Sequence, residues 1–129
     1  MDTDPLVILV EPARVMREVL KADLEEEFLC RVEVQDRVTN LRKAVVEEKP
    51  ALIVLDIETP GAQRFIMDIK DDPDTTAIPV IGANLSEHKS CQVAEAAGYD
   101  ACFKENLSDL KSLAGKYLSE RPIHQNRAV

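Results

Sequence analysis

Cysteine and histidine are scarce in this sequence, and their spacing excludes several kinds of site. The three cysteines, Cys30, Cys91 and Cys102, form no CxxC pair and leave an odd thiol. This pattern favours buried thiols in a reducing compartment over a zinc site or a disulfide framework. His88 and His124 have no second histidine or cysteine at ligand spacing. We therefore interpret both histidines as surface residues.

Long apolar runs and basic clusters are also missing. No stretch approaches the ~20 apolar residues that span a bilayer, and no basic segment followed by an apolar one opens the chain. The formal net charge of −8 argues against nucleic-acid binding through this domain, because phosphate contacts need clustered lysine and arginine. With 129 residues, 45% of them apolar and 31% charged, the sequence predicts one globular domain. We expect a cytoplasmic protein that binds neither membrane nor nucleic acid.

The most informative stretch is an apolar run at 51–55 that ends abruptly in Asp56. Pro50 precedes the run, and Pro60 and Gly61 follow it. A short continuous run between such residues predicts a strand that is covered on both faces, as in a parallel sheet. Ligands of open parallel sheets collect outside the carboxyl ends of the strands. We therefore expect Asp56 to take part in any chemistry or switching.

Strand and helix patterns alternate along the rest of the chain. Apolar runs predict further strands at 6–10, 78–83 and 101–103, and alternation of polar and apolar residues predicts a half-covered edge strand at 31–36. Helical periodicity predicts helices at 13–28, 39–48, 62–71, 86–98 and 107–118, with Thr39 and Ser86 as N-caps and Val93 facing inward. Such alternation predicts an α/β fold, a parallel sheet with helices on both faces. Residues 1–121 form the predicted domain, and 122–129 form a polar tail.

Polar side chains are predicted at the ends of four strands: Glu11, Asp56, Asn84 and Lys104. In a doubly wound sheet these ends converge on a single pocket. The two acids are oxygen ligands of the kind that Mg²⁺ prefers. Lys104 is suited to neutralising a phosphoryl group as a point charge.

The sequence resembles the receiver domain of bacterial response regulators, up to about Leu118. The matching segments are 8–11, Met16-Arg17, Leu55-Asp56 with Pro60 four residues on, 78–81, Ala97-Gly98 and Lys104. The resemblance implies a flavodoxin-like fold of five parallel strands in the order 2-1-3-4-5. It implies a signalling module rather than an enzyme. It also implies that Asp56 accepts a phosphoryl group from a histidine kinase and that the backbone carbonyl of Glu58 is a metal ligand.

The sequence departs from the receiver pattern at four positions. Pro12 stands where a second acid normally follows Glu11, and Asn84 replaces a small hydroxyl residue. Ala101 stands at the aromatic position, and Glu105 replaces a proline. Losing one carboxylate weakens a divalent-cation site, because attraction between close charges near a surface is worth a few kcal/mol. We expect weak Mg²⁺ binding.

Three functions are compatible with these residues. The first is a phosphoacceptor in a two-component phosphorelay, served by a sensor histidine kinase or a phosphotransfer protein. The second is a pseudo-receiver, which binds a downstream protein or a second copy through the fourth helix, fifth strand and fifth helix without phosphorylation. The third is a small-molecule binder, which the lack of a glycine-rich phosphate loop disfavours. The bland alternative for Asp56 is that it only caps the following turn.

Overall fold

The computed structural model describes residues 4–85, 90–104 and 106–122, and it contains one parallel sheet. The strand order is β2-β1-β3-β4-β5, and every neighbouring pair is parallel. The strands are β1 (Leu6–Val10), β2 (Arg31–Gln35), β3 (Leu52–Asp56), β4 (Val80–Asn84) and β5 (Ala101–Lys104). The predicted fold class and strand order are confirmed.

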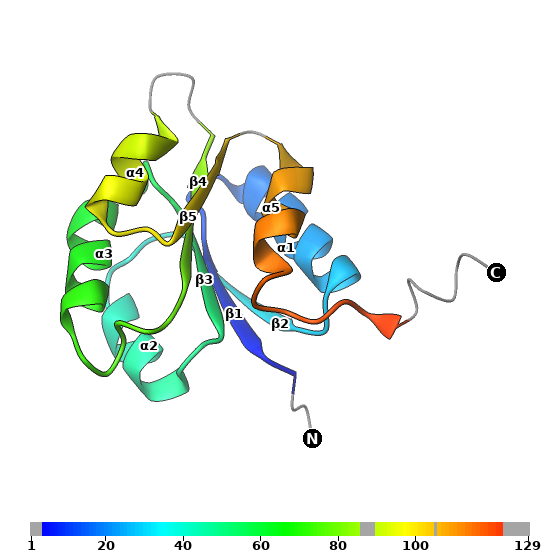
Figure 1. Cartoon of the computed structure of the whole chain (residues 1–129), viewed down its shortest axis with the longest axis horizontal. Helices are drawn as coiled ribbons and strands as arrows, with labels where there is room; N and C mark the ends of the chain where they lie inside the picture. The colour runs from blue at the N-terminus through cyan, green and yellow to red at the C-terminus, as the bar shows by residue number, and fades with distance from the viewer. Residues whose placement is uncertain (1–3, 86–89, 105, 123–129) are drawn as a thin grey trace.

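Five helices cover the two faces of this sheet. They are α1 (Arg14–Glu27), α2 (Leu41–Glu48), α3 (Ala62–Asp71), α4 (Cys91–Ala97) and α5 (Leu107–Ala114). Helices α1 and α5 lie on one face, and α2, α3 and α4 lie on the other (Figure 1). Two apolar clusters result, one under each layer of helices. Within the described residues, no helix has the length and apolar character needed to cross a membrane.

The three central strands are the most deeply buried part of the chain. Every residue of β1, β3 and β4 is buried, whereas β2 has an exposed end and an alternating pattern. The reason is visible in the sequence, since apolar runs without alternation suit strands that are covered on both faces. The carboxyl end of β3, where Asp56 lies, is therefore held by the most rigid part of the fold.

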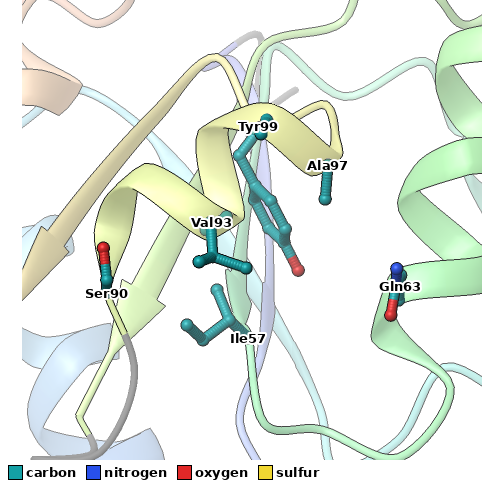
Figure 2. A pocket seen from close by; sticks show the side chains of 8 residues that line it. Ile57, Gln63, Ser90, Val93, Ala97 and Tyr99 are labelled. Atoms are coloured by element: carbon teal, nitrogen blue, oxygen red, sulfur yellow. The ribbon is translucent and has the colours of Figure 1, made fainter.

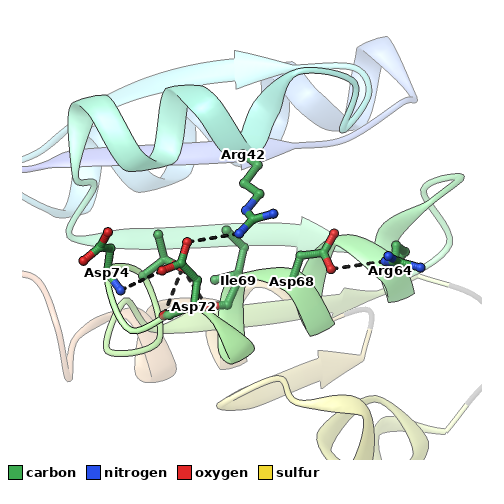
Figure 3. Close-up of polar contacts among 7 residues, drawn as sticks. Arg42, Arg64, Asp68, Ile69, Asp72 and Asp74 are labelled. Carbon is green, nitrogen blue, oxygen red and sulfur yellow. Dashed lines mark hydrogen bonds and ion pairs between the residues drawn. The ribbon is translucent and has the colours of Figure 1, made fainter.

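The end of α3 is fixed by side chains that replace the missing helical hydrogen bonds. Asp72 accepts a hydrogen bond from the backbone N–H of Asp74 at 2.9 Å and pairs with Arg42 of α2 at 3.1 Å (Figure 3). These two contacts hold the pKa of Asp72 below its ordinary value. Thr75 Oγ1 donates to the carbonyl of Ile69 at 2.7 Å. The turn after α3 is thereby attached to both α2 and α3.

Lys70 connects three segments at the amino-terminal ends of β4 and β5. Its ammonium donates to the carbonyl oxygens of Thr76 and Ile78 at 3.2 and 2.9 Å, and to Asp100 Oδ2 at 2.7 Å. The same Asp100 oxygen accepts the backbone N–H of Val80 at 2.7 Å. Because the ammonium is mostly buried, this network is screened less by solvent than a surface ion pair. It fixes the edge of the sheet opposite to Asp56.

Two predicted helix caps differ from the structure. Helix α2 begins at Leu41, and its N-cap is Asn40 in a left-handed conformation rather than Thr39. Asparagine tolerates this conformation better than threonine, which is branched at Cβ. Helix α4 begins at Cys91 with Ser90 as its N-cap, and Ser90 Oγ accepts the N–H of Gln92. The predicted cap Ser86 lies outside the described residues.

The predicted inward face of α4 is partly wrong. Ala94 is buried as expected, but Val93 is 68% exposed. The helix is only seven residues long, so its inner side consists of little more than one turn around Ala94. Periodicity over so short a segment does not fix which of two adjacent apolar residues faces the core.

The expectation of three buried thiols is also wrong for two of the cysteines. Cys30 is a buried free thiol, as predicted. Cys91 and Cys102, however, are half-buried and form a disulfide between α4 and β5. The fold brings their Cα atoms to 5.5 Å, a separation that a disulfide spans without backbone movement.

Candidate functional site

The carboxyl ends of β1, β3, β4 and β5 lie along one edge of the sheet and carry the four predicted polar residues. Asp56 ends β3 opposite Ala83, and Asn84 ends β4 opposite Lys104. Glu11 follows Val10 directly, whose partner on β3 is Leu55. Glu11 and Asp56 therefore stand side by side on neighbouring strands.

Glu11 is the most confined of the acids, with 2% of its surface exposed. Its Oε2 accepts the backbone N–H of Ala13 at 2.9 Å, whereas Oε1 has no hydrogen-bond partner among the described residues. Burial and the adjoining carboxyl of Asp56 raise the pKa of Glu11 to about 7, against the opposing effect of the Ala13 N–H. Two carboxylates only accept hydrogen bonds, so they share this space by holding a proton or a cation between them.

Arg17 holds the segment after β1 in place. Its guanidinium donates to the backbone carbonyl of Glu11 at 2.9 Å and to that of Pro12 at 3.4 Å. Its charge also works against the rise in the pKa of Glu11, as the weakest of the resolved influences. This positioning role was not predicted, because in the sequence Arg17 was noted only as part of a segment that matches the receiver pattern.

Asp56 is nearly buried, with 9% of its surface exposed, and it begins a tight turn. Its Oδ1 accepts the backbone N–H of Glu58 at 2.8 Å, and its carbonyl accepts the N–H of Thr59 at 3.0 Å. Asp56 therefore does cap the following turn, which was the alternative to a functional role for this residue. It engages one carboxylate oxygen, and the Asp56 carboxyl also makes a side-chain hydrogen bond with Glu11 when Glu11 is protonated.

Asn84 and Lys104 complete the edge in different ways. Asn84 has no exposed surface, whereas Lys104 is exposed. No ion pair among the described residues joins Lys104 to Asp56 or Glu11. The two strands β3 and β5 are separated by β4, which places their backbones about 10 Å apart. The structure thus brings Glu11 and Asp56 together and leaves Lys104 at the rim.

Tyr99 is a buried residue near the site that sequence reasoning missed. It is 6% exposed, and its hydroxyl has no hydrogen-bond partner among the described residues. Burial, followed by the nearby charge of Asp56, raises the pKa of the phenol. Its ring lies over Gly82, where a Cβ atom would come within 3.0 Å of the ring and 2.9 Å of Ile57. The signal in the sequence was faint: a glycine inside a strand, which marks close approach of a neighbour.

A cavity of about 550 Å³ opens beside Tyr99, between α4 and the segment that follows β3. Figure 2 shows the phenol hydroxyl pointing into the space between α4 and Gln63 of α3, with Ile57 and Val93 nearby. The wall formed by α4 is therefore not closely packed against the turn that carries Asp56.

A divalent cation fits the acid pair, although with few ligands. The buried Oε1 of Glu11 lacks a donor, and it adjoins a second carboxylate. Oxygen ligands of this kind suit Mg²⁺, which retains several waters. Among the described residues, however, no group of three or more acidic, histidine or cysteine side chains is placed to hold a metal. The residues are those of a weak site rather than a complete cage.

Comparison with solved structures identifies the fold. A putative response regulator from Chloroflexus aurantiacus J-10-fl superposes with a TM-score of 0.78 and 14% identity over 89% of this chain and 98% of that one. The signal receiver domain of a DNA-binding response regulator from Colwellia psychrerythraea 34H gives 0.77 and 20%, over 88% and 97%. The receiver domain of sensor histidine kinase PA1611 from Pseudomonas aeruginosa PAO1, with magnesium in its active-site cleft, gives 0.74 and 16%, over 89% and 98%.

This chain therefore has the fold of response regulator receiver domains. No protein-family model matches its sequence, and no curated protein matches it either. The likeness thus lies in the backbone architecture.

Proposed function

We propose that this chain is a receiver domain that accepts a phosphoryl group on Asp56. The observation that carries the proposal is the state of the Asp56 carboxylate at the end of the central strand. One oxygen is held by the N–H of Glu58 at 2.8 Å, and the carboxyl otherwise faces Glu11, with which it shares a hydrogen bond while Glu11 is protonated. The held oxygen fixes the orientation of the group, and the second oxygen is available as a nucleophile when Glu11 is ionised.

The reaction is a transfer from a phosphohistidine on a sensor histidine kinase or a phosphotransfer protein. The available oxygen of Asp56 attacks phosphorus, the P–N bond breaks as the P–O bond forms, and the imidazole leaves and takes up a proton. Asn84 is buried at the end of the adjacent strand, where its amide is suited to donating to a phosphoryl oxygen. Lys104, at the rim, supplies a mobile positive charge.

Glu11, Asp56 and the backbone carbonyl of Glu58 would hold Mg²⁺, which supplies positive charge for the phosphoryl oxygens when it is bound. The magnesium in the PA1611 receiver domain supports this assignment by analogy of fold. Pro12 stands where a further acid would sit, so affinity should be weak. Without a cation, the proton that Glu11 holds up to about pH 7 reduces the repulsion between the two acids.

Phosphorylation would act on partner proteins through the face formed by α4, β5 and α5. The cavity beside Tyr99 and the short α4 give this face room to rearrange. The proposed function favours a downstream protein as the partner that binds this face. A second copy of the chain is the other partner to test. Phosphotransfer from a sensor histidine kinase would take place in the cytoplasm, which is the location that this proposal includes.

A second candidate function is a pseudo-receiver that binds its partner without phosphorylation. Two observations favour it: Lys104 makes no ion pair with either acid among the described residues, and Glu11 is partly protonated near neutral pH. In this case, the acid pair would be a structural remnant. The two functions differ in whether Asp56 gains a phosphoryl group.

The test is incubation of the full chain with acetyl phosphate and excess Mg²⁺, followed by intact mass measurement. We expect a gain of one phosphoryl mass that Asp56→Asn abolishes. Asp74→Asn, at an exposed acid on the turn after α3, is the matched control and should be phosphorylated like the parent. Two results together would reject the phosphoacceptor function and leave the pseudo-receiver. The first is no gain of mass at saturating Mg²⁺, and the second is a hydrogen-exchange rate of α4 that acetyl phosphate does not change.

A further inference from the structure

The Cys91–Cys102 disulfide lies on the face that we propose for partner binding. Cys91 is the first residue of α4 and Cys102 is the second residue of β5. The bond spans 11 residues along the chain, so it closes a short loop and ties one end of a helix to the edge strand. The bond therefore constrains only the local arrangement of α4 and β5 and does not connect distant parts of the core.

The bond is a major attachment of the first turn of α4. The helix has seven residues, and Ala94 is its buried residue. A helix of this length has little stability of its own and depends on tertiary contacts. Val93 is exposed, and a cavity lies beneath the helix. Removing the covalent tie therefore leaves the amino-terminal turn with few contacts to hold it against the sheet.

Cys91 and Cys102 are partly exposed, in contrast to the third cysteine. Both cysteines are half-buried and line a depression of about 320 Å³, together with Lys104, Asp109 and other residues of α5 and β5. Cys30 is buried at 3% exposure, and burial raises its pKa to about 11. Thiol exchange should therefore involve the pair and spare Cys30.

We propose that Cys91 and Cys102 are a reversible dithiol–disulfide pair that controls whether the first turn of α4 is fixed to β5. Disulfides that form in reducing compartments are usually transient and redox-sensing rather than structural. The consequence for signalling rests on the proposed function, since it assumes that α4, β5 and α5 form the partner face. The redox switch itself does not depend on phosphorylation of Asp56.

The oxidant is a low-molecular-weight disulfide of the glutathione class. One cysteine thiolate attacks a sulfur of that disulfide and forms a mixed disulfide, which releases one small thiolate. The second cysteine thiolate attacks the protein sulfur of the mixed disulfide, forms the Cys91–Cys102 bond and releases the second small thiolate. The protein loses two electrons and two protons, and both appear in the two small thiols. Excess small thiol reverses the reaction by the same steps.

The experiment equilibrates the full chain in buffers of oxidised and reduced glutathione, quenches with acid and counts free thiols by alkylation and intact mass. We expect one free thiol at the oxidising end and three at the reducing end, after denaturation. Alkylation of the native reduced chain should modify the pair and leave Cys30 unmodified. A pair that stays reduced at the oxidising end, or stays oxidised in the native chain at the reducing end, would overturn the proposal.

Hydrogen exchange then tests the effect on α4. We expect amides of α4 to exchange at least about 10-fold faster in the reduced chain, with β1 and β3 unchanged. The Cys91→Ser and Cys102→Ser double variant should match the reduced chain under every buffer, and Cys30→Ser should behave like the parent. Equal exchange of α4 in the two redox states would refute the switch. Repeating the measurement with Asp56→Asn separates this outcome from failure of the phosphoacceptor proposal.

Discussion

The centre of the sheet differs from its margin, which is formed by β5 and α4, in burial, in the length of the elements and in packing. In the centre, β1 and β3 are buried along their whole length, and they carry the two acids at their ends. At the margin, β5 has four residues, α4 has seven, a cavity lies between α4 and the Asp56 turn, and a disulfide holds the two elements together. The proposed site therefore rests on the fully buried centre, whereas the proposed partner face is made of short elements beside a cavity.

The strongest way to test this contrast is to remove equivalent apolar side chains from the two regions. Ile53 in β3 is fully buried, so Ile53→Ala should lower the free energy of unfolding by about 2–5 kcal/mol through lost burial and a residual cavity. Val93→Ala in α4 should change it by less than about 0.5 kcal/mol, because the side chain is 68% exposed. Urea denaturation under reducing conditions measures both. Similar losses for the two variants would contradict the contrast.

A second test uses the acid pair at the central edge. The pKa of Glu11 rises from 4.5 to about 7 in the folded chain, so the folded state binds the proton more tightly than the unfolded one. The stability that this proton contributes is complete below about pH 4.5 and is lost as the pH rises through 7. Glu11→Gln cannot ionise, and at pH 8 it should raise the unfolding free energy by about 1–3 kcal/mol.

The measurement is urea denaturation at pH 4.5 and pH 8 in the presence of a chelator, so that no divalent cation occupies the pair. Glu18→Gln is the matched control, since Glu18 is exposed and, within the described part of the chain, pairs with Arg14 on α1. A Glu11→Gln variant whose advantage is the same at the two pH values would show that the titration of Glu11 is not responsible.

The smallest expected effect belongs to the margin. The Tyr99 hydroxyl is buried without a partner among the described residues, and such a group costs about 1–3 kcal/mol by mutational estimates. Tyr99→Phe should therefore raise the unfolding free energy, by about 1 kcal/mol, while the ring keeps its contact with Gly82. Tyr117→Phe, at a 39% exposed tyrosine, is the control. A loss of stability in Tyr99→Phe would show that the hydroxyl is hydrogen-bonded.

The sequence was sufficient for the architecture because its central strands are short, uninterrupted apolar runs with polar ends. Those runs fixed the order of elements and placed Glu11 and Asp56 at one edge. The margin was harder to predict, since its elements are short and its contacts are not local. Spacing alone did not reveal that Cys91 faces Cys102, that Ser90 begins α4, or that Tyr99 lies over Gly82. Nor does a sequence show which oxygen of a carboxylate keeps a hydrogen bond and which lacks one.

The network around Lys70 decides what kind of motion the margin can make. One cation pins the beginnings of β4 and of the loop into β5 through three acceptors, at the end of the sheet farthest from the acids. Because one end of this region is fixed, its movement would be a rotation about that end rather than a translation. When the Cys91–Cys102 disulfide is reduced, small displacements beside Asp56 would thus rotate α4 about this fixed end, and the largest movement would be at its first turn, near Cys91.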